Sequence, residues 1–300
     1  MIHFKHSKIL IPVDFSETSL LAIRHGAFIA SFVKADLHLL HVVNQNYGSQ
    51  NMFLPLVSLE IQTEIEKKAI ERLNELAEEL KHQYQIEIHK IVKLGSASTE
   101  ISQVAKEIGA SLIVMGTHGY SVIKELVIGS TAMKVLTKAP CPTMVTSVPT
   151  DRIGYTKIVL PIDNTVNTKQ KVHYALEMAK QFSATLYPLG LLDSAEEDQS
   201  PNMEMVIHQI EEMAKSKGVM YRSNIVKNVK NRANTTVEYC QTVGADLVII
   251  MTDQDAEVSG FFLGPYSQQI IHLSKVPVIA IRPEELYQTD GSLLTGTSSG

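Results

Sequence analysis

Residues 112–130 read LIVMGTHGYSVIKELVIGS, and the fold of the whole chain can be worked out from this stretch. It begins with a short apolar run typical of a buried strand and continues through Gly116 and Gly119. It closes on Gly129 and Ser130, just before a helical pattern. Glycines let a backbone approach an anion closely, and the free N–H groups at a helix start point toward such an anion. A strand, a glycine-containing loop and a helix start therefore predict a phosphate-binding segment.

An internal repeat surrounds this stretch. Residues 8–14 read KILIPVD and residues 157–163 read KIVLPID, while residues 109–115 read GASLIVM and residues 244–250 read GADLVII. Two halves that share the order of their motifs indicate duplication, with one domain in each half.

The length of 300 residues is sufficient for two domains of common size, each with its own core. We expect the first domain over residues 1–150 and the second over residues 151–285. The last stretch, residues 286–300, has little capacity to bury surface, so we expect a flexible tail there.

In the first half, short runs rich in Ile, Val and Leu alternate with segments of helical period. The runs that suit buried strands are residues 8–13, 37–43, 86–93, 112–115 and 142–148. Such alternation predicts an α/β fold with two doubly wound domains, each with an open five-stranded parallel sheet flanked by helices. Ligands of such sheets bind beyond the carboxyl ends of the strands, which places Asp14 near Gly116 and Gly119.

Composition narrows the class of protein. Hydrophobic residues make up 44% of the chain and charged residues 20%, as in ordinary globular proteins. The formal net charge of −5 argues against nucleic-acid binding, which needs clustered positive charge. The two cysteines, Cys141 and Cys240, lie far apart, and no apolar run reaches the length of a membrane span. We therefore expect a cytoplasmic protein that binds neither nucleic acid nor membranes.

Catalytic and metal-binding motifs find little support. The eleven histidines show no HExxH or other ligand spacing, so we expect no protein metal site. The sequence also lacks Walker A, GxGxxG and GxSxG motifs. We assign no catalytic residue, and only Asp14 and His118 would be candidates if the protein were an enzyme.

The residues Gly116, Gly119, Gly129 and Ser130 fit the pattern G-x2-G-x9-G-[ST]. This pattern resembles the nucleotide-binding signature of the universal stress protein family, and the whole chain up to Pro283 resembles the tandem form of that family. The resemblance implies Rossmann-like domains of the adenine nucleotide alpha hydrolase-like type and a role in stress response. It also implies ATP, with or without Mg²⁺, as the cofactor.

The same resemblance implies which residues contact the nucleotide. The end of the first strand would contact adenine and ribose, the end of the second strand would line the adenine pocket, and the glycine-containing segment would hold the phosphates. The implied binding residues are Pro12, Val13, Asp14, Val42, Met115, Gly116, His118, Gly119, Gly129, Ser130 and Thr131. Asp14 has an alternative role as the N-cap of the following helix, which Ser16 could fill as well.

The second half departs from the pattern. After residues 244–250 comes MTDQD, with no glycine where Gly116 and Gly119 stand in the first half, and with two aspartates, Asp253 and Asp255, in this segment. The equivalent of Gly129 in the second half depends on how the residues are counted. One count aligns Pro277 with Pro140 and runs backward, the other runs forward from the end of the strand, and the two give different residues. We interpret this as a loop two residues longer than in the first half. Negative charge near a triphosphate is unfavourable, so we predict that the second domain does not bind ATP as the first does.

Three aromatic residues in this region of the second half, Phe261, Phe262 and Tyr266, have two alternative roles. They could cover another ligand or a partner, or they could pack against the helices of their own domain.

Three functions remain open at this point. The first is a nucleotide-responsive regulatory protein with ATP in the first domain and unknown protein partners. The second is a slow ATPase or nucleotide-dependent transferase, and the third is an interaction module without nucleotide binding. In family dimers the fifth strands pair between subunits, so the resemblance implies an intramolecular pseudo-dimer of the two domains and leaves a further homodimer open.

Overall fold

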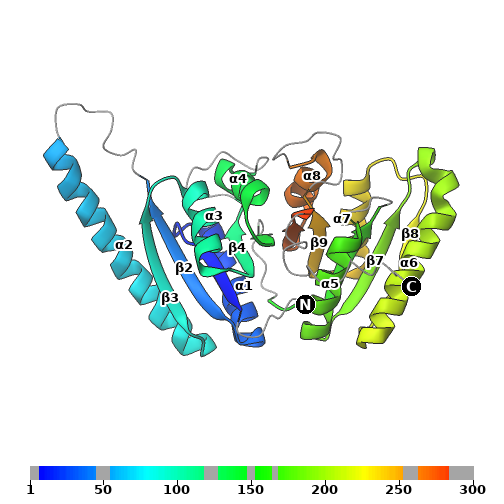
Figure 1. The fold of residues 1–300 in the computed structure, drawn as a ribbon, viewed down its shortest axis with the longest axis horizontal. Helices are drawn as coiled ribbons and strands as arrows, with labels where there is room; N and C mark the ends of the chain where they lie inside the picture. The colour runs from blue at the N-terminus through cyan, green and yellow to red at the C-terminus, as the bar shows by residue number, and fades with distance from the viewer. Residues whose placement is uncertain are drawn as a thin grey trace, which may run out of the picture. The chain divides into compact units, whose positions relative to one another are not determined.

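The computed structural model describes residues 7–44, 55–117, 128–146, 153–163, 168–252 and 263–283. The chain divides into two compact units between Gly154 and Tyr155. We refer to the N-terminal unit as domain 1 and to the C-terminal unit as domain 2, and describe each by itself (Figure 1). His118 and Gly119 lie outside the described residues, as do Phe261 and Phe262.

Domain 1 contains a five-stranded sheet in which every described pair of neighbouring strands is parallel. The order across the sheet is β3-β2-β1-β4-β5. The strands are β1 (Lys8–Pro12), β2 (Asp36–Val43), β3 (Ile88–Leu94), β4 (Leu112–Gly116) and β5 (Thr143–Thr146). The chain runs outward from β1 to β3 and returns to place β4 on the other side of β1. The strand order therefore reverses between β1 and β4, which is where open α/β sheets bind ligands.

Four helices cover the two faces of this sheet. They are α1 (Glu17–Val33), α2 (Pro55–Tyr84), α3 (Ala97–Ile108) and α4 (Ser130–Lys138). Helices α1 and α2 pack against each other and against the sheet on one face, and α3 packs against α4 on the other. Because both faces are covered, the central strands are buried along most of their length, which explains their continuous apolar runs.

Domain 2 repeats this architecture with the strand order β10-β9-β6-β7-β8. Its strands are β6 (Lys157–Ile162), β7 (Thr185–Leu191), β8 (Asn224–Val226), β9 (Leu247–Met251) and β10 (Val278–Ile281). Its helices are α5 (Thr168–Phe182), α6 (Ser200–Lys217), α7 (Arg232–Val243) and α8 (Pro265–Leu273), with a 3₁₀ helix, η2 (Ser194–Gln199), after β7. The predicted α/β class with open five-stranded parallel sheets is confirmed.

The two domains can be matched residue by residue. Helices α3 and α7 are both 12 residues long, and each ends before a glycine in the left-handed region, Gly109 and Gly244. In domain 1 Ile113 pairs with Thr143, and in domain 2 Val248 pairs with Val278. Each of these equivalent positions differs by 135 residues, so residues 97–146 correspond to residues 232–281 without a gap.

This match corrects the interpretation of a longer loop in the second half. The N–H of Ile113 donates to the carbonyl of Pro142, and the N–H of Val248 donates to the carbonyl of Pro277. Pro277 is therefore the equivalent of Pro142 and not of Pro140. The segments between β4 and α4 and between β9 and α8 have equal length, and Gly264 corresponds to Gly129. The two-residue difference came from anchoring the count on the wrong proline.

None of the described helices combines the length and the apolar character that a membrane crossing requires. The predicted pairing of the fifth strands concerns the relation between the two domains and stays a prediction.

Candidate functional site

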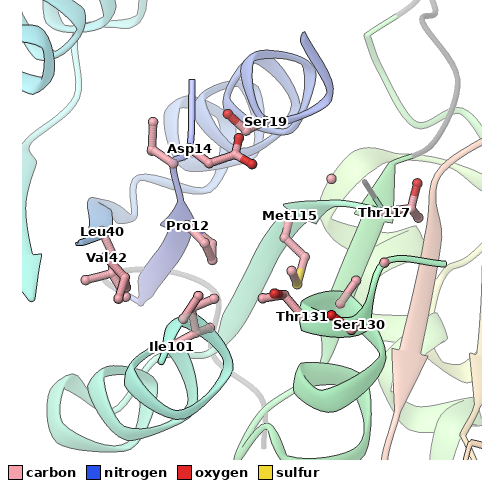
Figure 2. A pocket seen from close by; sticks show the side chains of 15 residues that line it. Pro12, Asp14, Ser19, Leu40, Val42, Ile101, Met115, Thr117, Ser130 and Thr131 are labelled. Atoms are coloured by element: carbon pink, nitrogen blue, oxygen red, sulfur yellow. The ribbon is translucent and has the colours of Figure 1, made fainter. Parts of the chain in front are cut away.

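A pocket of about 240 Å³ opens in domain 1 where β1 and β4 end (Figure 2). Figure 2 shows Leu40 and Val42 on one side of this pocket and Met115, Ser130 and Thr131 on the other. The structure brings together every described residue of the predicted set, namely Pro12, Val13, Asp14, Val42, Met115, Gly116, Gly129, Ser130 and Thr131. The pocket is also lined by residues that the sequence did not single out, which are Ser19, Leu40, Ala97, Ile101, Thr117 and Ala132.

One wall of the pocket is apolar. Leu40 and Val42 come from the end of β2, and Ala97 and Ile101 come from the start of α3. Met115, which is 5% exposed, lies on β4. Such a wall excludes water and suits a flat, weakly polar group such as a nucleobase.

Asp14 lies in the turn between β1 and α1. The N–H of Val13 still pairs with the carbonyl of Leu40 at 2.8 Å, so the sheet bonding runs one residue past the end of β1. Asp14 itself is exposed, and its Oδ1 accepts hydrogen bonds from the N–H and the hydroxyl of Ser16 at 3.0 and 2.5 Å. Among the described residues no hydrogen bond reaches its Oδ2, which leaves this oxygen available to a ligand.

The N-cap of α1 is Ser16, whose Oγ accepts the N–H of Ser19 at 3.3 Å. The alternative role of Asp14 as the N-cap is therefore taken by Ser16. Asp14 instead orients the capping hydroxyl. Ser19 lies one turn further on, and its buried Oγ has no hydrogen-bond partner among the described residues. A buried hydroxyl without a partner costs free energy, so a donor or acceptor in the adjoining pocket would be favourable there.

The turn that carries Asp14 is held by an aromatic residue in an unusual conformation. Phe15 has a φ of +63°, a region that bulky L-residues avoid. Its ring packs against His41 with a centroid distance of 5.2 Å, and the guanidinium carbon of Arg72 lies 4.2 Å from its ring centroid. His41 Nδ1 lies 2.7 Å from the carbonyl oxygen of Val13, so this nitrogen carries the proton and donates. These contacts offset the backbone strain and fix the position of Asp14.

The start of α4 supplies backbone donors that have no hydrogen-bond partner among the described residues. Gly129 is its N-cap and has no side chain to cap the helix, and the first helical bond runs from the N–H of Met133 to the carbonyl of Gly129. The N–H groups of Ser130, Thr131 and Ala132 therefore have no partner within the helix. The first turn contains no acidic residue, so the positive end of the helix dipole is not neutralised locally. This is the arrangement that binds phosphate groups.

Two backbone hydrogen bonds fix the ends of the glycine-containing loop. The N–H of Gly129 donates to the carbonyl of Thr117 at 2.8 Å, and the N–H of Thr117 donates to the carbonyl of Thr146 at 3.1 Å. The start of α4 is thus held against the ends of β4 and β5. Its N–H groups keep their place relative to the sheet.

Packing explains why position 116 is a glycine, which the sequence alone did not reveal. A Cβ at this position would lie 2.8 Å from the side chain of Thr18 and 2.9 Å from its carbonyl carbon. Glycine is therefore required because α1 begins against the end of β4. Its bare backbone also lines the pocket, so packing and ligand access call for the same residue.

The chemistry of the described lining is that of a binding site. Among those residues Asp14 is the one titratable side chain. The described part of the chain holds no cluster of three or more His, Cys, Asp or Glu residues that could bind a metal ion. The described lining therefore offers a ligand an apolar wall, one exposed carboxylate and the backbone donors at the start of α4.

Comparisons with known proteins show the family of the chain. The model of the universal stress protein family matches the chain twice, over residues 5–147 and 154–282. Universal stress protein MJ0577 of Methanocaldococcus jannaschii is 28% identical over 152 residues, which covers 47% of this chain and 94% of that protein. Universal stress protein MJ0531 of the same organism is 33% identical over 151 residues, covering 48% of this chain and 84% of that protein.

Solved structures match over both domains. The crystal structure of a universal stress protein from Archaeoglobus fulgidus DSM 4304 has a TM-score of 0.74 with 19% identity, and covers 93% of this chain and 97% of that one. A universal stress protein from Pseudomonas aeruginosa UCBPP-PA14, described as putative, has a TM-score of 0.70 with 17% identity, and covers 95% of this chain and 96% of that one. At these identities the likeness shows a common fold.

Proposed function

The chain belongs to the universal stress protein family, and from this premise we propose that it is a nucleotide-responsive regulatory protein that holds ATP in domain 1 only. The observation that carries the proposal is a single pocket with an apolar wall at one end and unpaired donors at the other. These two ends suit the base and the phosphates of one adenine nucleotide.

Each part of the pocket has a role in this proposal. The apolar wall of Leu40, Val42 and Ile101 would hold adenine by burial of its faces. Asp14 would accept hydrogen bonds from the ribose hydroxyls through Oδ2, because a carboxylate is a strong acceptor for two neighbouring hydroxyl groups. The buried hydroxyl of Ser19 would gain the partner that it lacks in the described structure.

The phosphates would lie at the start of α4. The N–H groups of Ser130, Thr131 and Ala132 provide the donors, and the hydroxyls of Ser130 and Thr131 can add to them. His118 and Gly119 remain proposed contacts from the resemblance to the family. Any Mg²⁺ would arrive with the nucleotide, since Asp14 is the one carboxylate among the described lining residues.

A regulatory role fits this lining better than catalysis. Hydrolysis of ATP needs a group that activates water and positive charge on the transferred phosphate. Among the described residues that line the pocket, Asp14 is the one side chain that could activate water, and none carries a positive charge. We therefore propose that occupancy of the pocket changes how the protein meets protein partners in the cytoplasm.

Isothermal titration of the nucleotide-free protein with ATP tests this proposal. We expect one ATP per chain, and we expect Gly129→Asp to weaken binding by at least about 100-fold, because a carboxylate at the N-cap repels the phosphates. Aspartate is a favourable N-cap and the φ of −57° at Gly129 is open to any residue, so the fold should persist.

Gly129→Asn is the matched control, because asparagine has the same shape and capping capacity without the charge. It should retain most of the affinity. A wild-type protein that binds no nucleotide, or a Gly129→Asp protein that binds ATP as the wild type does, would overturn the proposal.

A further inference from the structure

Several residues of domain 2 that correspond to pocket-lining residues of domain 1 differ from them in size and polarity. Ala97, Ile101 and Thr131 line the pocket of domain 1. With the offset of 135 residues, their equivalents are Arg232, Thr236 and Tyr266. Gly116, at the end of β4, corresponds to Met251 at the end of β9. At two of these positions, Arg232 and Tyr266, domain 2 has a much larger side chain than domain 1.

Tyr266 crosses the equivalent space. Its ring is 7% exposed, and its hydroxyl lies 3.2 Å from Oγ1 of Thr236 on α7. The matched residues in domain 1, Thr131 and Ile101, both line the open pocket. Burial raises the pKa of Tyr266 above its ordinary value, so the hydroxyl keeps its proton and can hydrogen-bond to Thr236. Of the two alternatives for Tyr266, packing against the helices of its own domain is the one observed.

Arg232 occupies the position of Ala97 and is held by carboxylates from the segment after β7. Its Nη2 pairs with Glu196 and lies 3.4 Å from Oδ2 of Asp193. Burial opposes its charge, but the hydrogen bond to Glu196 and the charges of Glu196, Asp163 and Asp193 raise the pKa of Arg232. The guanidinium is thus oriented by carboxylates in the region where domain 1 is open.

The carboxylate at the end of the first strand also has a different environment. Asp14 is exposed in domain 1, whereas its equivalent Asp163 is 5% exposed. The first two strands of the domains are offset by 149 residues, and with this offset the fully buried Lys171 stands where domain 1 has the small residue Ala22. Burial lowers the pKa of Lys171 to about 8, and the charge of Asp163 acts in the opposite direction. Asp163 is therefore balanced by charges of its own domain.

The start of α8 is less able to hold phosphate than the start of α4. Pro265 replaces Ser130 at the first helical position, so one backbone N–H is missing. Ser267, the equivalent of Ala132, uses its hydroxyl on the carbonyl oxygens of Met251 and Thr252, at 2.7 and 3.1 Å. Both changes reduce the number of donors that remain for a ligand.

We propose that domain 2 fills its own nucleotide position with protein side chains, and that Arg232 and Tyr266 are the residues that exclude a ligand from it. This inference rests on the proposed function, since the equivalent pocket of domain 1 is assigned to a nucleotide. Domain 2 is then a ligand-independent copy of the domain that responds to ATP. The volume of these two side chains, as well as the different sequence that follows β9, excludes nucleotides from domain 2.

The test compares two double variants of the full chain. Arg232→Ala with Tyr266→Thr restores the residue sizes of domain 1, whereas the control Arg232→Met with Tyr266→Phe keeps the volume and removes the polar groups. The probe is adenosine, because Pro265 has already removed a phosphate donor. Methyl NMR signals of Leu189 and Ile250, the equivalents of Leu40 and Met115, report on domain 2.

We expect saturable shifts of these signals with millimolar adenosine in the first variant, and no shifts in the wild type or in the control. A folded first variant without shifts, or shifts in the wild type, would contradict the proposal. The signals of domain 1 in the same titration report on the proposed function separately, so the two failures are distinguishable.

A reverse substitution covers the case in which the opened variant does not fold. Ala97→Arg with Thr131→Tyr introduces the two side chains into domain 1, and we expect a loss of ATP affinity of at least about 100-fold with unchanged thermal unfolding. The control Gln103→Arg with Lys138→Tyr places the same two side chains at exposed positions of α3 and α4 outside the pocket, and it should bind ATP as the wild type does. Wild-type affinity in the first of these variants would overturn the proposal.

Discussion

Gly116 and Gly129 belong to the same sequence pattern, but the structure gives them different roles. Gly116 lies so close to Thr18 that any side chain would meet α1. Gly129 has an ordinary negative φ and is the N-cap of α4, so its small size leaves space in front of the helix. Loss of nucleotide binding in a Gly116 variant would therefore be ambiguous, whereas loss in a Gly129 variant would point to the ligand.

Gly116→Ala should destabilise domain 1 whether or not nucleotide is present. The added methyl group would lie 2.8 Å from the Thr18 side chain, and such overpacking commonly costs about 1–3 kcal/mol. Urea unfolding of the nucleotide-free protein measures this cost, with Gly129→Ala, at a position of ordinary negative φ, as the matched variant. Equal stability of the two variants would contradict the packing role.

His38 is the second residue whose role can be tested alone. It is 7% exposed, both of its ring nitrogens lack a hydrogen-bond partner among the described residues, and it stacks on His89 with a centroid distance of 4.5 Å. Burial, followed by the charges of His89 and Lys8, lowers the pKa of His38 to about 4. Between pH 4 and 6.5 the unfolded state therefore binds more protons than the folded state.

The stability of domain 1 should accordingly fall as the pH decreases from 6.5 to 4, with a contribution from His38 on the order of 3 kcal/mol. His38→Phe keeps an aromatic ring against His89 and removes the titrating group. Its free energy of unfolding should exceed that of the wild type by more at pH 4.5 than at pH 7. Parallel pH profiles from urea unfolding would refute this assignment.

At the scale of elements, the sequence was sufficient for the order of strands and helices, and nine of the predicted binding residues lie around one pocket. The apolar run of residues 112–115 falls within β4, and the helical pattern after Gly129 is α4. The ends of elements were less accurate, because the expected strand at residues 142–148 is β5 (Thr143–Thr146) and the expected strand at residues 86–93 is β3 (Ile88–Leu94). Apolar residues continue past the hydrogen-bonded part of a strand, so composition alone does not locate its ends.

The pocket residues that the sequence missed share a physical reason. Ala97, Ile101 and Leu40 carry no chemical signal, since an apolar residue on a helix or strand is ordinarily part of the core. Phe15 does not line the pocket but holds the turn that carries Asp14, and it was missed for a different reason, because its side chain disfavours the positive φ that it adopts. These positions become visible only when α3, β2 and the turn after β1 are seen together.

Two substitutions at Ser130, in the first turn of α4, separate the contribution of its backbone N–H to ATP affinity from that of its hydroxyl. Ser130→Pro removes one N–H at the first helical position, where proline is well tolerated, and so it copies the start of α8. Ser130→Ala removes only the hydroxyl. We expect the proline variant to lose about tenfold or more in ATP affinity, as for one hydrogen bond to a charged group, and the alanine variant to lose less.

Circular dichroism should show that both Ser130 variants retain the helix. Equal affinities for the proline and alanine variants would mean that the hydroxyl, and not the backbone donor, contacts the ligand.

At the scale of the whole molecule, the chain is a duplicated scaffold with two different sites. Domain 1 leaves unpaired donors and an exposed carboxylate around a pocket, whereas domain 2 uses the equivalent positions for contacts within itself. A ligand that binds only domain 1 stabilises only domain 1 directly. At a nucleotide concentration of about 100 times Kd this stabilisation amounts to roughly 2.7 kcal/mol.

Hydrogen–deuterium exchange of the full chain with and without saturating ATP tests this asymmetry most directly. The account predicts slower exchange in α4 and at the end of β4, and unchanged exchange in α8 and at the end of β9. Protection in α8, or no protection in either domain, would contradict the assignment of a single nucleotide site to domain 1.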